Sequence, residues 1–229
     1  MVLALVLTGG AGLAQTQAPA AGRVVLEARG NEPSWALTVT PETLTLRGMM
    51  LAEPITAATP QPTQAPDGAT VYTVAGAKPL IVRVVERICT DPMTGMPFPR
   101  QVAVAVDGRT LTGCGGTTAE ALRGSWIVTA INGKAPIATA EPTLEFADEG
   151  KLSGKGSCNR FVTGVTLTGE SLTISQAATT MMACPQPVME QEALFLAVLT
   201  GTTRCTITAD GTLTLHAGDG RTLTARRMP

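Results

Sequence analysis

Histidine, aromatic residues and charges of either sign are all scarce in this chain of 229 residues. His216 is the single histidine, which excludes His-based metal clusters and leaves little material for an acid–base relay. Aromatic residues make up 3% of the chain and charged residues 15%, and the formal net charge is −1. This composition supplies neither a basic patch nor stacking platforms for nucleic acid. We therefore expect no nucleic-acid partner, no metal and no cofactor.

Motifs for catalysis or nucleotide binding are missing as well. The sequence contains no G-x-S-x-G, no P-loop and no G-x-G-x-x-G that opens a helix. The acidic pairs at 148–149 and at Glu190 with Glu192 are explained by turn polarity and by the helix dipole. Residues 154–157 (Gly-Lys-Gly-Ser) resemble a phosphate loop in composition alone and predict a β-bulge or a tight strand crossing. We expect no catalytic residues and no enzyme; the remote alternative, a cryptic hydrolase, needs His216 beside a carboxylate and a hydroxyl.

The start of the chain predicts export. Residues 1–13 are uncharged and mainly apolar, and small residues precede a predicted cleavage between Ala14 and Gln15. We expect a signal peptide at 1–14, a Pro/Ala-rich linker at 15–22, and a periplasmic or secreted bacterial protein. The apolar run is shorter than the roughly 20 residues that cross a bilayer, and no cysteine adjoins the cleavage position, so no stable membrane anchor is expected. No Lys or Arg precedes the run, which leaves the true translation start open.

The cysteines agree with export. There are five, Cys89, Cys114, Cys158, Cys184 and Cys205, and none forms a C-x-x-C. Without histidines they make no zinc-type set. An oxidising compartment therefore favours disulfides, and the odd number leaves one thiol or one intermolecular bond over.

Short β-type runs alternate with turn signals in the first half, which predicts a β domain over 23–116. Strands are expected at 35–39, 43–46 and 80–85. Residues 102–112 form a predicted hairpin around an Asp-Gly turn. The Pro-, Thr- and Ala-rich stretch 53–68 is expected to be an exposed loop, and the small, polar segment 115–123 to be the domain boundary.

The second half repeats the β pattern and predicts a second domain over 120–229. An Asn-Gly turn at 132–133 and a cleanly alternating run at 143–146 indicate strands. Residues 188–199 follow two prolines, carry an apolar stripe and end before Gly201, which predicts a helix. The expected fold is mainly β (β-rich α+β): two small antiparallel β domains, the second with one helix packed on the sheet.

The second half also carries distinctive motifs. They are Ser-Trp at 125–126, Pro-Thr-Leu-Glu-Phe at 142–146, Cys-Asn-Arg-Phe at 158–161 and Met-Met-Ala-Cys at 181–184. Together they resemble the META domain, the module of HslJ-type bacterial envelope proteins. The resemblance implies a compact β domain with one helix, in exported or lipid-anchored proteins tied to stress and antibiotic tolerance, with no established catalytic residues. The first half resembles a less characterised domain that often precedes META domains, through motifs at 30–35, 89–99 and 113–115.

This resemblance, together with chain entropy, predicts two disulfides. Cys89 is expected to pair with Cys114, and Cys158 with Cys184, each stabilising the fold by about 3 kcal/mol. Cys205 is left over and is expected to be a buried, small hydrophobic residue on a strand.

Four residues are candidates for contact with a ligand or partner: Trp35, Trp126, Asn159 and Arg160. Each tryptophan begins a strand and is expected to fill a core, with ligand stacking as the alternative. Asn159 is expected to hold a turn, and Arg160 is either a surface charge or part of a recognition patch. Of the two adjacent methionines at 181–182, at most one is expected to face a core, and the other could join an apolar contact patch.

These observations predict a non-catalytic, monomeric envelope protein that acts in stress or antibiotic tolerance. Its partner or small ligand is not identified by the sequence. The alternative is a small-ligand-binding or inhibitor module, in which one β domain offers a groove. An apolar cavity rimmed by Trp35 or Trp126 would favour this alternative over closed cores.

Overall fold

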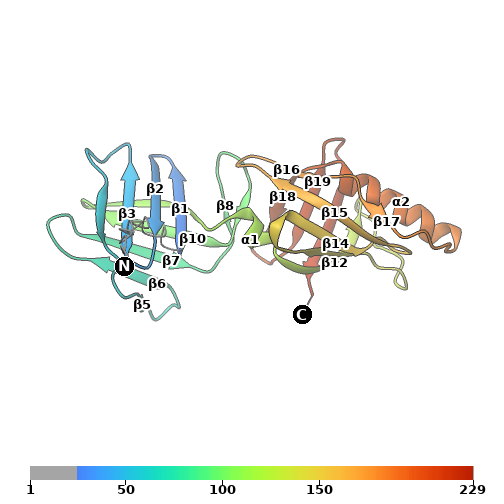
Figure 1. The fold of residues 1–229 in the computed structure, drawn as a ribbon, viewed down its shortest axis with the longest axis horizontal. Coiled ribbons are helices and arrows are strands. Elements are labelled where there is room, and N and C mark those ends of the chain that lie inside the picture. The colour runs from blue at the N-terminus through green and yellow to red at the C-terminus, as the bar shows by residue number, and fades with distance from the viewer. Residues whose placement is uncertain (1–24, 229) are drawn as a thin grey trace, which may run out of the picture.

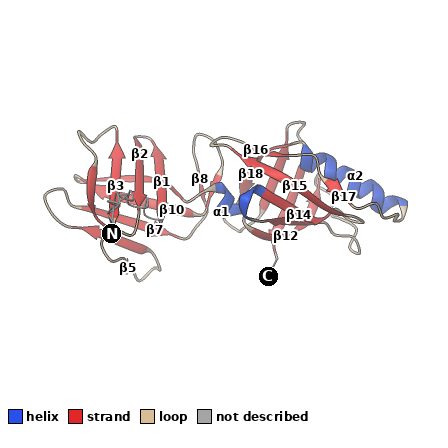
Figure 2. Ribbon diagram, in the orientation of Figure 1, coloured by secondary structure: helices blue, strands red, loops and turns tan. Residues whose placement is uncertain are grey.

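The computed structural model describes residues 25–228, and the predicted signal peptide (1–14) and linker (15–22) lie outside this range. Two β-rich halves lie one after the other along the longest axis of the molecule (Figure 1). Each half is built on an antiparallel sheet, and the long helix α2 accompanies the second sheet (Figure 2). The predicted mainly β fold with two antiparallel halves is confirmed. Between residues 25 and 228, no helix is long and apolar enough to cross a bilayer.

The first half contains one nine-stranded sheet. Its strands are β1 (Leu26–Asn31), β2 (Ser34–Val39), β3 (Thr43–Gly48), β4 (Ile55–Ala58), β5 (Thr63–Gln64), β6 (Thr70–Val74), β7 (Leu80–Val85), β10 (Arg100–Val106) and β11 (Arg109–Gly115). Their order is β4-β3-β2-β1-β11-β10-β7-β6-β5. Alternate side chains, such as Leu37, Leu44 and Val104, are buried on one face, as a half-buried sheet requires. Asp107 and Gly108 have φ values of 49° and 70°, which suit the two-residue turn of the predicted β10–β11 hairpin.

The stretch 53–68, expected to be an exposed loop, is only partly one. It supplies both edge strands of the first sheet, since β4 pairs with β3 and β5 pairs with β6. Ile55 at the start of β4 is 6% exposed and joins the first core. A four-residue strand rich in Thr and Ala has little periodicity of its own, and its backbone is paired because the longer strand β3 lies beside it.

The second half contains a sheet whose main order is β16-β15-β14-β13-β12-β20-β19-β18, with β17 paired to β15. Its strands are β12 (Gly124–Ile131), β13 (Thr143–Phe146), β14 (Lys151–Lys155), β15 (Arg160–Leu167), β16 (Leu172–Ile174), β17 (Ala178–Thr179), β18 (Thr202–Ile207), β19 (Leu213–Ala217) and β20 (Thr222–Arg227). A 3-10 turn, η1 (Asp148–Gly150), precedes β14. The end strands β16 and β18 contact each other, so the sheet curls towards a barrel.

Helix α2 (Gln186–Thr200) is longer than the predicted helix at 188–199 by two residues at its start and by one at its end. Pro187 lies in its first turn, where a missing N–H costs nothing, and Gly201 caps its end. Phe195, Val198 and Leu199 are buried in the second core, where the Phe195 ring lies 5.6 Å from that of Phe161. The apolar stripe of α2 therefore covers one side of the second sheet.

The segment 115–123 differs from the polar boundary that was expected. It contains a short helix, α1 (Thr118–Leu122), which starts with a capping box between Thr117 and Glu120. Ala121 and Leu122 are 2% and 1% exposed and belong to the second core. The polar capping residues Thr117 and Glu120 make this segment look like a polar boundary in the sequence. The two buried positions, Ala121 and Leu122, lie in the single turn of helix that these residues cap.

A small hairpin from the first half closes the core of the second. It consists of β8 (Cys89–Thr90) and β9 (Pro97–Phe98), which pair with each other and with no other strand. Met96 is 0% and Phe98 5% exposed, and both lie in the same apolar cluster as Trp126 and Leu122. Residues that precede the boundary in sequence therefore belong to the core that follows it.

Candidate functional site

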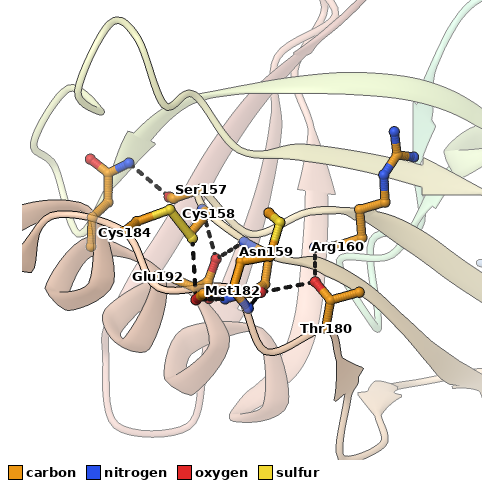
Figure 3. Close-up of a disulfide and its surroundings, with 9 residues drawn as sticks. Ser157, Cys158, Asn159, Arg160, Thr180, Met182, Cys184 and Glu192 are labelled. Carbon is orange, nitrogen blue, oxygen red and sulfur yellow. Dashed lines mark hydrogen bonds between the residues drawn. A yellow bond between two sulfur atoms is a disulfide. The ribbon is translucent and has the colours of Figure 1, made fainter.

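A buried carboxylate on α2 organises the motif residues of the second half (Figure 3). Glu192 is 5% exposed. Its Oε2 accepts hydrogen bonds from the backbone N–H of Cys158 at 2.8 Å and of Asn159 at 2.6 Å. Its Oε1 accepts a third bond from Nδ2 of Asn159 at 2.7 Å. The carboxylate thus satisfies three donors at the point where the chain turns between β14 and β15.

Asn159 links this turn to residues 180–182, which precede α2. Its Oδ1 accepts hydrogen bonds from the Thr180 hydroxyl at 2.9 Å and from the Met182 backbone N–H at 2.7 Å. The Cys158–Cys184 disulfide ties the same two segments covalently. The Cys-Asn-Arg-Phe and Met-Met-Ala-Cys motifs are therefore two sides of one clamp, and Asn159 holds more than the turn that was predicted for it.

The sequence interpretation of Glu192 was wrong. The helix dipole was expected to explain it, whereas its role is to satisfy buried N–H groups 33 and 34 residues away. A neighbouring glycine is the available signal: a Cβ on Gly156 would lie 3.1 Å from Oε2 of Glu192. Of the two alternatives predicted for the Gly-Lys-Gly-Ser segment, the structure has the tight crossing, because a Cβ on Gly154 would lie 2.0 Å from the Thr143 carbonyl oxygen and the β14–β15 register has no bulge.

The clamp presents methionines to solvent rather than to a core. Met181 is 98% and Met182 54% exposed, so neither faces a core, which agrees with the expectation of at most one. Asn159 is 4% exposed and its amide is fully engaged, which leaves it unable to contact a ligand. Arg160 is exposed on β15 and is the one predicted contact residue of this half with a free surface.

Both tryptophans fill cores, as expected. Trp126 is 0% exposed; its indole N–H donates to the Leu122 carbonyl at 2.7 Å, and the Arg227 guanidinium lies 4.4 Å from the ring centroid. Trp35 is 3% exposed and donates to the Thr112 carbonyl at 3.2 Å. Ligand stacking on Trp126 is excluded by its burial. Trp35 borders a cavity of about 190 Å³, smaller than the roughly 300–1,000 Å³ of small-molecule sites.

The motifs of the first half form a second clamp, around Trp35. A Cβ on Gly30 would lie 2.2 Å from the Trp35 indole nitrogen, and a Cβ on Gly113 would lie 2.0 Å from the Arg29 carbonyl. Glycine is therefore required at both positions for strands β1 and β11 to close on the ring. The Cys89–Cys114 disulfide lies beside this packing and anchors the β8–β9 hairpin to β11.

Asp91 shapes the hairpin that reaches the second core. Its side chain accepts hydrogen bonds from Asn31 Nδ2 at 3.1 Å and from the backbone N–H groups of Met93 and Thr94 at 2.9 Å. Burial alone would raise the pKa of Asp91, but these hydrogen bonds outweigh it and lower the pKa below its ordinary 3.8. The Asn31 and Asp91 motifs together fix the direction in which Met96 and Phe98 project.

A cleft of about 350 Å³ lies where the two halves meet. Its lining includes Glu27 and Arg29 of β1, Phe98 of β9 and Leu167 from the end of β15. The Arg29 guanidinium lies 5.0 Å from the Phe98 ring centroid. Within residues 25–228, neither Glu27 nor Arg29 forms an ion pair. The cleft therefore combines an apolar wall with an unpaired cation and an unpaired carboxylate, and its volume suits a small ligand.

His216 has only part of the surroundings that the hydrolase alternative requires. Its Nε2 lies 3.0 Å from the Thr206 hydroxyl, and no carboxylate is among its recorded hydrogen-bond partners in the described part of the chain. Burial and then the charge of Arg204 lower the pKa of His216 below its ordinary 6.5. Across residues 25–228, no group of three or more His, Cys, Asp and Glu side chains is placed to hold a metal ion.

All five cysteines lie in the described residues, and each is either in a disulfide or buried. Both predicted disulfides are present and close loops of 25 and 26 residues. Cys205 is free and 0% exposed, and burial raises the pKa of its thiol to about 12. The folded protein therefore presents no reactive thiol at neutral pH.

Comparison with known proteins places the second half in a family. Residues 119–228 match the family model of the META domain. An NMR structure of a protein from Burkholderia xenovorans is 28% identical, covering 48% of this chain and 86% of its own, with a TM-score of 0.43. Another NMR structure is also 28% identical, covering 48% of this chain and 95% of its own, with a TM-score of 0.41. No curated protein matches the chain.

Proposed function

Because the C-terminal half of the chain is a META domain, we propose that the protein is a non-catalytic factor of the bacterial envelope that acts in stress or antibiotic tolerance. The observation that carries the location is one disulfide in each half, since such bonds persist in oxidising compartments. The surroundings of His216 support a role without catalysis, because its recorded contacts do not form a nucleophile–base–carboxylate arrangement.

Intact-mass spectrometry of the exported protein tests the location. We expect the mass of a chain that begins at Gln15 and contains two disulfides. Alkylation of the native protein should add nothing, because Cys205 is buried with its pKa raised to about 12, and alkylation after unfolding should add one group. A full-length chain that takes five alkyl groups after unfolding without reductant would mean a reducing compartment and would contradict the proposal.

The cleft between the halves favours a second candidate function, binding of a small zwitterion with an apolar body. Arg29 can pair with a carboxylate, and Glu27, two residues away on the same face of β1, with an ammonium group. Phe98 and Leu167 supply the apolar wall between the halves. Short apolar peptides with free termini have this chemistry, and it would make the protein a peptide-binding or inhibitor module.

Calorimetry with tripeptides of alanine, leucine and phenylalanine tests the cleft. A charge-assisted bond to Arg29 contributes about 1.5–3 kcal/mol, so Arg29→Glu should weaken binding about tenfold or more. Arg47→Glu is the matched control, because Arg47 is exposed on β3 of the same sheet and does not line the cleft. Amidated peptides should also bind less tightly. Equal loss in both variants, or no peptide binding below about 1 mM, would exclude this function.

A further inference from the structure

Methionine occupies the surface of this protein as no other large apolar residue does. Seven of the ten exposed large apolar side chains are methionines: Met49 (85%), Met50 (48%), Met93 (73%), Met181 (98%), Met182 (54%), Met189 (37%) and Met228 (45%). Met96, at 0% exposed, is the one buried methionine between residues 25 and 228. Methionine is ordinarily among the residues most often buried, so this distribution is the reverse of the usual one.

Leucine, the apolar residue most similar to methionine, is not exposed in the same way. Leucine has a similar volume and apolarity and exchanges with methionine at little cost in protein cores. In the part of the chain that the structure describes, every leucine is buried or partly buried and none is exposed. Besides the seven methionines, only Val25, Ile81 and Val162 are exposed among the large apolar residues that the structure describes, so methionine is over-represented on this surface.

The exposed methionines are also scattered. Met49 and Met50 follow β3, Met93 lies in the turn between β8 and β9, and residues 181–182 precede α2. Met228 follows β20 at the far end of the sequence. Met189 lies in the first turn of α2, so the seven are spread over several elements of both halves, and what they share is an exposed side chain that ends in a thioether.

These thioethers are the only accessible reactive sulfurs in the described residues. Four cysteines are in disulfides, and Cys205 is buried. The burial that raises its pKa to about 12 also keeps the thiolate, which is the form that reacts with peroxides, out of reach. A two-electron oxidant that meets the folded protein therefore meets methionine first.

We propose that the exposed methionines are sacrificial oxidation sites, which consume peroxide-class oxidants without loss of the fold and are restored by methionine sulfoxide reductases. In the oxidation, a sulfur lone pair attacks one oxygen of hydrogen peroxide, the O–O bond breaks, and the second oxygen takes the proton of the attacked oxygen and leaves as water. Sulfur loses two electrons and becomes a sulfoxide. In the reduction, a dithiol supplies two electrons and two protons, the sulfoxide oxygen leaves as water, and the dithiol becomes a disulfide.

The exposed positions suit this cycle because the sulfoxide is polar. None of the seven exposed methionines belongs to either apolar core, so an added oxygen there breaks no core contact. The same change at Met96 would put a polar group into the core shared with Phe98 and Trp126. The fold thus separates the methionines whose oxidation leaves the cores intact from Met96, whose oxidation would disrupt one.

Hydrogen peroxide treatment of the folded chain, followed by peptide mass spectrometry, tests the proposal. We expect sulfoxide at the seven exposed sites, with Met181 among the fastest, and oxidation of Met96 about tenfold slower or more, because it requires local opening. The urea midpoint should be unchanged, and the two sulfoxide reductases with a thiol reductant should restore the mass.

A protection assay separates sacrifice from incidental damage. The native chain should slow the oxidation of a methionine-containing indicator protein in the same solution. A variant with all seven exposed methionines changed to leucine, and a second with all seven changed to glutamine, should fold and lose this protection. Equal protection by a folded variant, a lowered urea midpoint after oxidation, or oxidation of Met96 as fast as Met181 would each overturn the proposal.

Discussion

Replacement of Glu192 by alanine is expected to lower the free energy of unfolding by about 4 kcal/mol. The substitution removes the acceptor of three buried donors, the backbone N–H groups of Cys158 and Asn159 and the Asn159 amide. Each buried donor left without a partner costs about 1–3 kcal/mol. We expect repacking of the surrounding side chains to recover only part of that cost. The rest remains, because α2 still covers the three donors and keeps water from hydrogen bonding to them.

Urea unfolding measures this loss, and the same helix supplies its control. Glu190 is exposed, and the Gln186 side chain is its recorded partner at 2.8 Å, so Glu190→Ala should change stability by less than about 0.5 kcal/mol. Glu192→Gln keeps one acceptor oxygen and should lie between the two. If Glu192→Ala were as stable as Glu190→Ala, the clamp would contribute nothing to the fold.

Local patterns explain what could be predicted from the sequence. The β10–β11 hairpin follows from period-2 alternation on either side of Asp107 and Gly108, and every residue of that signal lies within a few positions of the turn. Helix α2 likewise follows from its prolines, its apolar stripe and Gly201. Burial of Trp126 agrees with the same kind of evidence, since an aromatic residue at an inward position of a strand fills a core.

What the sequence could not provide is contact between distant segments. Glu192 looks like any acidic residue in the first turns of a helix until Asn159, 33 residues earlier, is placed beside it. The cleft was missed for the same reason. Strand alternation puts Arg29 on the outer face of β1, but Phe98 reaches it from a Pro- and Gly-rich stretch with no periodicity. Ile55 is a milder case, in which a neighbouring strand decides the structure.

The β8–β9 hairpin gives the second large prediction, because it carries the first half into the core of the second. Phe98→Ala is expected to destabilise the protein by about 3–5 kcal/mol, the usual cost of a phenylalanine deleted from a packed core. Met93→Ala, in the same hairpin but 73% exposed, should cost less than about 0.5 kcal/mol. Both substituted side chains belong to the β8–β9 hairpin and differ in burial, so the comparison isolates the contribution of core packing.

Tryptophan fluorescence locates the loss. In a Trp35→Phe background, Trp126 is the remaining indole, and it lies in the same apolar cluster as Phe98. Phe98→Ala should therefore lower the urea midpoint that Trp126 reports, although residue 98 precedes the META domain match at 119–228. An unchanged Trp126 midpoint would mean that the second core holds without the hairpin. A lowered midpoint would mean that the META domain of this chain completes its core with residues from the preceding domain, so that the two halves are stable as one unit.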